Sequence, residues 1–337
     1  MKRLLSLLLT ALALTGCAEI DAWREPTPPP VARDDTAPVF HVEDGQVLTP
    51  SGQPFVARGI NLQYGDSPAL KYPSIAVIAS VKANIVRLEL RRNTTAQQLR
   101  TALDAFAAEK LPVMAMYWES DITCHTSGHI LRRDFERLWL KRWRPVLQDP
   151  KYAPFLMLNL ANEWGTSKGN YEAYIDTYTP LIARMRAAGY RQPIVIDAAD
   201  CGQNAGSFLE ARGRRLEAAD PLHNLIVSVH AYAVPWNSDA KIDQNISDLQ
   251  ATGVPFLIGE FGDTQLDLPN NAVDHLHLMK AAQGAGVGWI AWSWKGNGGA
   301  AKILDISRSY GSADLTRRGG EIVNGPDGLQ ATAIPAF

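Results

Sequence analysis

Short, nearly continuous apolar stretches alternate with amphipathic stretches along most of the chain. The apolar stretches have the length and character of buried β-strands, and they span residues 55–61, 84–90, 112–118, 155–162, 193–199, 225–231, 255–260 and 287–294. The helical candidates between them are residues 95–110, 131–147, 170–188 and 270–284. Strands that are apolar on both faces are typical of a parallel sheet covered by helices. The pattern therefore predicts a series of strand–helix repeats.

Eight such repeats, with no glycine-rich dinucleotide motif, predict an α/β fold in which residues 39–337 form one (β/α)8 TIM barrel. A doubly wound open sheet is the alternative, although such sheets more often stop at about five or six strands. Residues 41–55 hold Asp44-Gly45 and Ser51-Gly52 between short apolar runs. These turn residues predict an N-terminal β-hairpin cap at one end of the barrel.

The composition is that of an ordinary globular protein. Apolar residues make up 46% of the 337 residues and charged residues 20%, which excludes extensive disorder. The chain has 33 Lys and Arg against 35 Asp and Glu, a formal net charge of −2, which argues against a nucleic-acid partner. Nine Trp residues indicate a ligand site lined by indoles. We expect the protein to be a monomer.

The N-terminus is predicted to be a signal for export. Residues 1–16 join a short basic segment to an apolar run that is too short to span a bilayer. Leu14-Thr15-Gly16-Cys17 resembles the lipobox of bacterial lipoproteins, which implies cleavage before Cys17 and lipidation of that cysteine. A plain secretory signal with an incidental cysteine is the alternative. Residues 17–38 are polar and rich in proline, and we interpret them as an extended linker between lipid and barrel.

The residue after the cysteine bears on localisation. It is Ala18 rather than aspartate, and the resemblance to lipoproteins of Gram-negative bacteria then implies an anchor in the outer membrane. No later segment has 18 uninterrupted apolar residues, so the lipid is the expected contact with the membrane. Which side of the outer membrane the barrel faces stays open.

Two glutamates lie where the functional face of such a barrel is expected. Active sites of (β/α)8 barrels lie at the C-terminal ends of the strands. Glu163 directly follows the fourth predicted strand, and Glu260 ends the seventh. These strands lie on opposite sides of the ring, so the two carboxylates can face each other, an arrangement that suits glycoside hydrolysis. For either glutamate alone, a residue at a helix N-terminus is the alternative.

Other polar residues are predicted to lie beside these carboxylates. Arg87 stands among apolar residues and needs a carboxylate partner, for which Glu260 is the prediction and Glu89 the alternative. His230 and Tyr232 share a face by strand alternation. They are predicted to contact the substrate or Glu260, although His230 alone reads as a core histidine.

The tryptophans divide into two groups. Trp292 and Trp294 share a face at the end of the eighth predicted strand, where an indole can stack on a sugar. For Trp294, core packing is the alternative. Trp139 and Trp143 are four residues apart on a predicted helix, and packing of that helix on the barrel explains them best.

These features together resemble glycoside hydrolase family 5, in the large retaining (β/α)8 clan. The residues that match are Asn162-Glu163, His230-Ala231-Tyr232, Glu260 and Trp292, at the ends of the fourth, sixth, seventh and eighth strands. Within the family, the chain most resembles bacterial endo-β-1,4-mannanases, in residues 197–203, 288–298, 314–316, 319 and 322–328. The resemblance covers roughly residues 39–331.

The resemblance implies a retaining enzyme that cleaves mannan or glucomannan without a cofactor or metal. Glu163 would be the general acid/base and Glu260 the nucleophile, with their carboxyl groups ~5 Å apart. The implied substrate-binding residues are Arg87, Asn162, His230, Tyr232, Trp292 and Trp294. A β-1,4-glucanase of the same family and a non-catalytic glycan-binding lipoprotein are the alternatives.

Two segments depart from the family pattern. Residues 116–121 read Met-Tyr-Trp-Glu-Ser-Asp where many relatives have a His-Asp pair, which leaves the distal subsites and substrate preference open. Trp164-Gly165-Thr166 follows the predicted acid/base, where relatives often have proline. We expect this change to alter the shape of the loop without removing catalysis.

Cys124 and Cys201 follow the third and fifth predicted strands and so reach the same rim. Because the exported compartment is oxidising, we predict a disulfide between them, with two free thiols as the alternative. Cys124, His125 and His129 can also be read as metal ligands. Their loop is polar and no second cluster accompanies them, so no metal is predicted.

Overall fold

The computed structural model describes residues 38–166, 171–262 and 272–337. The predicted signal peptide, Cys17 and nearly all of the predicted linker lie outside the described residues. Among the described residues, none of the helices has the length and apolar character needed to cross a membrane.

Eight parallel strands form a closed barrel. They are β3 (Arg58–Leu62), β4 (Ile85–Leu90), β5 (Val113–Tyr117), β6 (Leu156–Asn159), β7 (Ile194–Asp197), β8 (Leu225–Ala231), β9 (Phe256–Phe261) and β10 (Gly288–Ala291). Each strand pairs with the next along the chain, and β10 pairs with β3 to close the ring. This order confirms the predicted (β/α)8 barrel.

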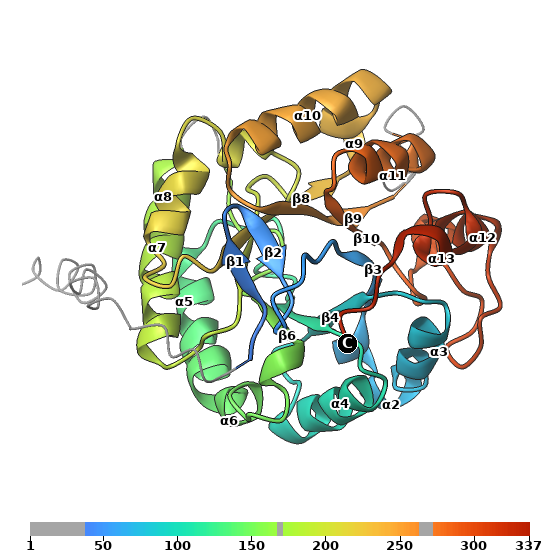
Figure 1. Cartoon of the computed structure of the whole chain (residues 1–337). Helices are drawn as coiled ribbons and strands as arrows, with labels where there is room; N and C mark the ends of the chain where they lie inside the picture. The colour runs from blue at the N-terminus through green and yellow to red at the C-terminus, as the bar shows by residue number, and fades with distance from the viewer. Residues whose placement is uncertain (1–37, 167–170, 263–271) are drawn as a thin grey trace, which may run out of the picture.

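Helices surround the barrel (Figure 1). The longer ones are α3 (Ser74–Ser80), α4 (Ala96–Ala108), α5 (Gly128–Arg137), α7 (Glu172–Ala187), α8 (Arg212–Ala218), α10 (Asp239–Ala251), α11 (His275–Gly284) and α12 (Arg317–Asn324). The short ones are α2 (Pro68–Lys71), α6 (Arg144–Leu147), α9 (Ala233–Trp236) and α13 (Leu329–Thr332). The helix predicted over 131–147 is interrupted, because a π-helical turn separates α5 from α6 and Pro145 in the first turn of α6 cannot extend an earlier helix.

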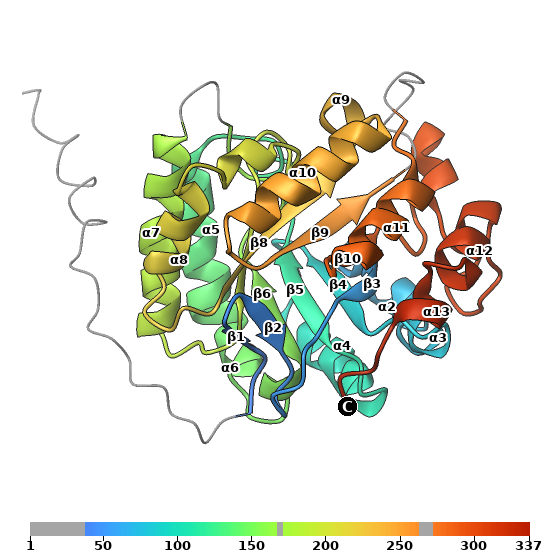
Figure 2. The same cartoon turned by 45° about the horizontal axis from the view of Figure 1, so that its top comes forward.

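The predicted N-terminal cap is present. Strands β1 (His41–Glu43) and β2 (Gln46–Leu48) form an antiparallel hairpin at one end of the barrel (Figure 1), opposite the end where α9 lies (Figure 2). Phe40 and Phe55 are buried with apolar residues from the first part of several barrel strands. The N-terminal end of the barrel is therefore closed by an apolar plug.

Above this plug the barrel interior becomes polar. Strand alternation points Arg87, Asn159 and Asp197 inward, and all three are fully buried. Side chains with the opposite orientation pack against the surrounding helices. Trp139 and Trp143 belong to this outer layer and have no exposed surface. Their rings meet edge to face with centroids 5.3 Å apart, which confirms their predicted packing role.

Candidate active site

Arg87, on β4, is the centre of a buried network inside the barrel. Its side chain has no exposed surface. The guanidinium donates to Glu260 Oε1 at 2.5 Å and to Asp197 Oδ2 at 2.9 Å. Its other contacts, at 2.8–3.1 Å, are to the side-chain oxygens of Asn61, Asn159 and Asn162. One cation thus holds side chains from several strands at the same level of the barrel.

Asp197, at the end of β7, is the second anion of this network. Burial alone would raise the pKa of its carboxyl, but the positive charges of Arg87 and His230 outweigh burial and lower the pKa of Asp197 to about 2. Asp197 also accepts a hydrogen bond from the backbone N–H of Glu163 at 3.1 Å. Sequence reasoning missed this residue, although a carboxylate at the end of a strand is the signal that identified Glu260.

Replacing Arg87 with methionine is expected to lower the free energy of unfolding by about 3–5 kcal/mol, because the carboxylates of Asp197 and Glu260 lose their cation inside the barrel. Guanidinium unfolding measures this loss. The control is Arg214→Met, which removes a surface ion pair with Glu217 and should cost less than about 1 kcal/mol. Equal losses in the two variants would contradict the role assigned to Arg87.

Glu260, on β9, presents its two oxygens to different donors. Oε1 accepts from Arg87, and Oε2 accepts from the Tyr232 hydroxyl at 3.1 Å. The side chain is only 5% exposed. This geometry confirms the predicted contact between Arg87 and Glu260. The alternative partner Glu89 instead lies 3.4 Å from Arg91.

Glu163 lies in the loop after β6, which ends three residues earlier than the sequence pattern predicts. Its backbone has a φ of +52°, and its side chain is 12% exposed. Burial raises the pKa of the Glu163 carboxyl, and the negative charge of Glu260 raises it further. The hydrogen bond from His230 lowers this pKa but does not outweigh burial. A carboxyl with a raised pKa is suited to donate a proton near neutral pH.

His230, on β8, lies behind both glutamates. Its Nδ1 is 2.7 Å from Glu163 Oε1 and 3.7 Å from Glu260 Oε1, and its Nε2 is 3.5 Å from Asp197 Oδ2. Burial opposes the charged imidazolium, but the three carboxylates outweigh it and raise the pKa of His230 to about 10. Neither His230 nor Arg87 has exposed surface, so the structure shows their contacts with the carboxylates, and their contact with substrate stays a prediction. Both hold the carboxylates in place.

The two glutamates approach each other across the mouth of the barrel. One carboxylate oxygen of each lies within 4.8 Å of the other, close to the predicted ~5 Å. Retaining glycosidases hold their carboxyl groups about 5–5.5 Å apart, and inverting ones about 6.5–9.5 Å apart. Glu163, His230 and Glu260 also have the spacing of a metal site. The carboxylates around His230 raise its pKa, so a metal bound there would have to displace the imidazole proton.

The family model of cellulase (glycosyl hydrolase family 5) matches residues 48–298. The chain belongs to glycosyl hydrolase family 5. The mannan endo-1,4-beta-mannosidase of Salipaludibacillus agaradhaerens is 30% identical to it over 303 residues, which cover 88% of this chain and 94% of that protein. The family predicted from the rim motifs is confirmed.

Solved structures of family 5 enzymes resemble the chain over most of its length. The beta-mannanase from Thermomonospora fusca superposes with a TM-score of 0.81 at 27% identity, covering 89% of this chain and 99% of that one. The mannotriose complex of a Thermomonospora fusca beta-mannanase gives a TM-score of 0.79 at 27% identity, with the same coverage. The fold of this chain is therefore shared with these enzymes over 89% of its length.

The two rim tryptophans of this family 5 chain occupy different environments. Trp292 is partly exposed, and its indole N–H donates to Asn297 Oδ1 at 2.8 Å. Trp294 has no exposed surface, which favours the alternative of core packing, and its contact with sugar stays a prediction. Strand β10 ends at Ala291, so the alternation that placed both indoles on one face does not continue to these residues.

The remaining predicted substrate-binding residues lie beside the glutamates. Asn162 accepts from Arg87 and donates to Thr123 Oγ1 at 3.2 Å, so its amide orientation is fixed from two sides. Tyr232 is almost buried against Glu260. Their contacts with sugar stay predictions. The sequence pattern did not indicate Thr123 as a partner of Asn162, because Thr123 lies in a loop and only the path of that loop brings it to the site.

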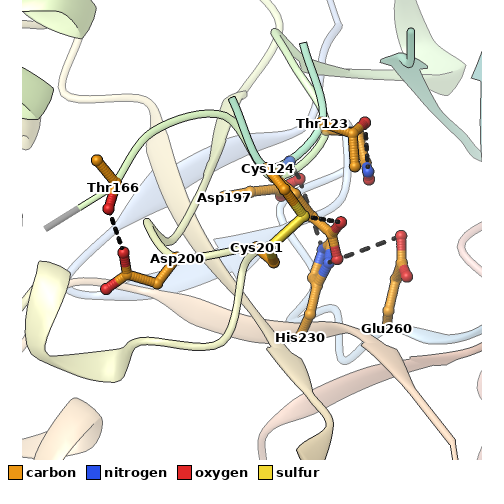
Figure 3. The surroundings of a disulfide bond; sticks show 10 residues. Thr123, Cys124, Thr166, Asp197, Asp200, Cys201, His230 and Glu260 are labelled. Carbon is orange, nitrogen blue, oxygen red and sulfur yellow. Dashed lines mark hydrogen bonds and ion pairs between the residues drawn. A yellow bond between two sulfur atoms is a disulfide. The ribbon is translucent and has the colours of Figure 1, made fainter. Parts of the chain in front are cut away.

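The predicted disulfide between Cys124 and Cys201 is present (Figure 3). It links positions 77 residues apart, for which the chain-entropy model gives a stabilisation of about 4 kcal/mol. The bond also removes the cysteine ligand from the alternative metal site with His125 and His129.

The two segments that depart from the family pattern have defined contacts. The Arg91 guanidinium packs over the indole of Trp118, with its central carbon 3.8 Å from the ring centroid. A carboxylate oxygen of Glu119 lies 3.4 Å from the same guanidinium. Gly165 has a φ of +107°, and a Cβ there would lie 2.7 Å from the ring of Tyr174. The loop after Glu163 therefore depends on this glycine.

Proposed function

We propose that the protein is a retaining endo-β-1,4-mannanase that acts on mannan or glucomannan. The observation that carries the proposal is the separation of the Glu163 and Glu260 carboxylates, within 4.8 Å, which favours retention. The relatives support the choice of substrate. One is a mannan endo-1,4-beta-mannosidase, and Thermomonospora fusca beta-mannanase has been solved with mannotriose and with mannohexaose.

In the first step, Glu163 donates its proton to the glycosidic oxygen while a Glu260 oxygen attacks the anomeric carbon. The bond from that carbon to the leaving sugar breaks, and a covalent glycosyl–enzyme ester forms. Arg87 and Tyr232 hold Glu260 in its attacking orientation. The raised pKa of Glu163 keeps its proton available for this step.

In the second step, Glu163 acts as a base. It takes a proton from water, whose oxygen attacks the anomeric carbon and releases Glu260 as a carboxylate. Esterification has removed the negative charge of Glu260, so the pKa of Glu163 falls between the two steps, as its change from acid to base requires. The protonated His230 holds Glu163 through both. Two inversions give net retention.

Product analysis on mannan, glucomannan, xyloglucan and cellulose tests the proposal. We expect mannooligosaccharides of several lengths from mannan and glucomannan, and little release from the other two. Faster release from cellulose would replace the proposal with a β-1,4-glucanase. Binding to mannan without release of reducing sugar would replace it with a non-catalytic glycan-binding protein.

Replacing Trp292 with alanine is expected to lower kcat/KM on mannooligosaccharides about 30-fold, because the partly exposed indole is the proposed platform beneath the sugar. Steady-state kinetics on mannohexaose measures the effect. The control is Trp294→Phe, a change in the buried indole that should alter stability and leave KM unchanged. A similar rise in KM for both variants would contradict the distinction between the two tryptophans.

We also infer, from the N-terminal motif, that the protein is exported and tethered to the outer membrane by a lipid on Cys17. The proline-rich residues 17–38 would separate the lipid from the barrel. Labelled palmitate should be incorporated into the wild-type chain and not into Cys17→Ala. Equal labelling of both chains would exclude this anchor.

A further inference from the structure

Three loops on the functional face meet around Glu163. The loop after β5 carries Cys124, the loop after β6 carries Glu163, and the loop after β7 carries Cys201. The disulfide joins the first loop to the third (Figure 3). Strand β6 lies between β5 and β7 in the barrel, so the loop of Glu163 begins between two segments that are covalently linked.

Backbone hydrogen bonds attach the middle loop to both of its neighbours. The N–H of Cys124 donates to the carbonyl of Glu163 at 3.0 Å, and the N–H of Gly165 donates to the carbonyl of His125 at 2.9 Å. On the other side, the N–H of Asp200 donates to the carbonyl of Gly165 at 3.0 Å. The Glu163 backbone, at φ +52°, is thus held by the two loops that the disulfide connects.

The disulfide also contacts the functional atoms themselves. Cys124 Sγ lies 3.8 Å from Glu163 Oε2, while the other carboxylate oxygen, Oε1, is hydrogen-bonded to His230 Nδ1 at 2.7 Å. Beyond Cys201, the carbonyl of Gly202 accepts from the backbone N–H of His230 at 2.8 Å, and a Cβ at Gly202 would lie 2.6 Å from the His230 ring. The loop of Cys201 therefore fixes the imidazole that in turn holds Glu163.

Glu260 is held by other parts of the fold. It lies within β9, and its oxygens contact Arg87 on β4 and Tyr232 directly after β8. These elements belong to the barrel wall or adjoin it. Loosening the disulfide should therefore disturb Glu163 far more than Glu260.

We propose that the Cys124–Cys201 disulfide is a positioning element for Glu163, which it holds at the distance from the glycosidic oxygen that proton donation requires. The proposal rests on the proposed role of Glu163 as acid/base. Cys124 is exposed, so a dithiol reductant added in solution can reduce the bond to two thiols while it is itself oxidised to a disulfide. Reduction would then weaken acid catalysis while the nucleophile stays in place.

The test compares two substrates in the full-length Cys124→Ala/Cys201→Ala variant. Mannohexaose needs a proton on its leaving oxygen, whereas 2,4-dinitrophenyl β-mannobioside has a leaving group that departs without one. We expect kcat/KM to fall about 10- to 100-fold on mannohexaose, the range for a displaced catalytic group. On the activated substrate it should stay within about 2-fold, because the step that needs Glu163 as acid is bypassed.

Controls separate positioning from loss of stability. Partial unfolding removes active molecules and lowers both rates equally, so the ratio of the two kcat/KM values is the readout. If the double variant does not fold, the same ratio is measured on the wild-type chain before and after reduction. The chain has three cysteines, so treating a folded double variant with reductant reveals any effect that comes through Cys17.

An equal loss on both substrates, or no loss on either, would overturn the proposal. The outcome is distinct from failure of the proposed function. If the oxidised wild-type chain hydrolyses neither substrate, or if Glu163→Ala lowers both rates equally, the role of Glu163 itself is wrong. If Glu163→Ala discriminates between the substrates and the disulfide variant does not, only the positioning role of the disulfide fails.

Discussion

Replacing Glu260 with alanine should abolish hydrolysis, with kcat on mannan falling on the order of 10⁵-fold. The reason is that Glu260 is the proposed nucleophile, held in place by hydrogen bonds from Arg87 and Tyr232. Without the carboxylate, no glycosyl–enzyme ester forms. Release of reducing sugar measures the loss. The matched control is Glu172→Ala, which removes a surface carboxylate on α7 and should leave kcat within about 2-fold.

Azide distinguishes loss of a nucleophile from loss of structure in Glu260→Ala. The small anion can occupy the space left by the carboxylate and attack the anomeric carbon of 2,4-dinitrophenyl β-mannobioside. We expect the α-glycosyl azide, because a single displacement inverts the configuration. Turnover near the wild-type rate without azide would refute the assignment of Glu260 as nucleophile.

Replacing Glu163 with alanine is expected to lower kcat/KM on mannohexaose by about 10²- to 10⁴-fold, the usual contribution of a general acid. The value on 2,4-dinitrophenyl β-mannobioside should change little. With azide present, the product should be the β-glycosyl azide, because the anion now attacks the intermediate on Glu260 and gives two inversions. An α-azide from this variant would mean that the two glutamates have exchanged roles.

The pH profile gives a second measurement on Glu163. Burial and the charge of Glu260 raise the pKa of its carboxyl. The protonated form is the active one in the first step, so wild-type kcat/KM on mannohexaose should fall as the pH rises through this pKa. The alkaline decline should disappear in Glu163→Ala, since no proton remains to be lost. An unchanged decline in the variant would assign it to another group.

The barrel and its two glutamates were predictable because they depend on local signals. Each strand is a nearly continuous apolar run, and a carboxylate at or directly after the end of such a run stands out in the printed sequence. The order of the strands around a (β/α)8 barrel then places the fourth and seventh strands three positions apart, so that residues at their ends can meet across the mouth. Arg87 was predictable for a similar reason, since a charge among apolar residues requires a partner.

The contacts that the sequence did not predict depend on where strands end and how loops pack. The placement of Trp294 on the sugar face assumed alternation beyond Ala291, where β10 has already ended. His230 was expected at the substrate or Glu260, yet its shortest contact is with Glu163, which a loop brings over it. The grouping of Thr123 and the disulfide around Glu163 likewise depends on loop geometry that no periodic pattern records, whereas Asp197 ends β7 and was missed although its signal was present.

Proton NMR of mannohexaose hydrolysis by the wild-type enzyme tests the retaining mechanism most directly. Newly formed reducing ends appear first in one anomeric form and only later reach equilibrium by mutarotation. With the Glu163 and Glu260 carboxylates within 4.8 Å, we predict internal cleavage with the β-anomer appearing first. Initial release of the α-anomer, or no cleavage of mannohexaose, would contradict a retaining β-mannanase.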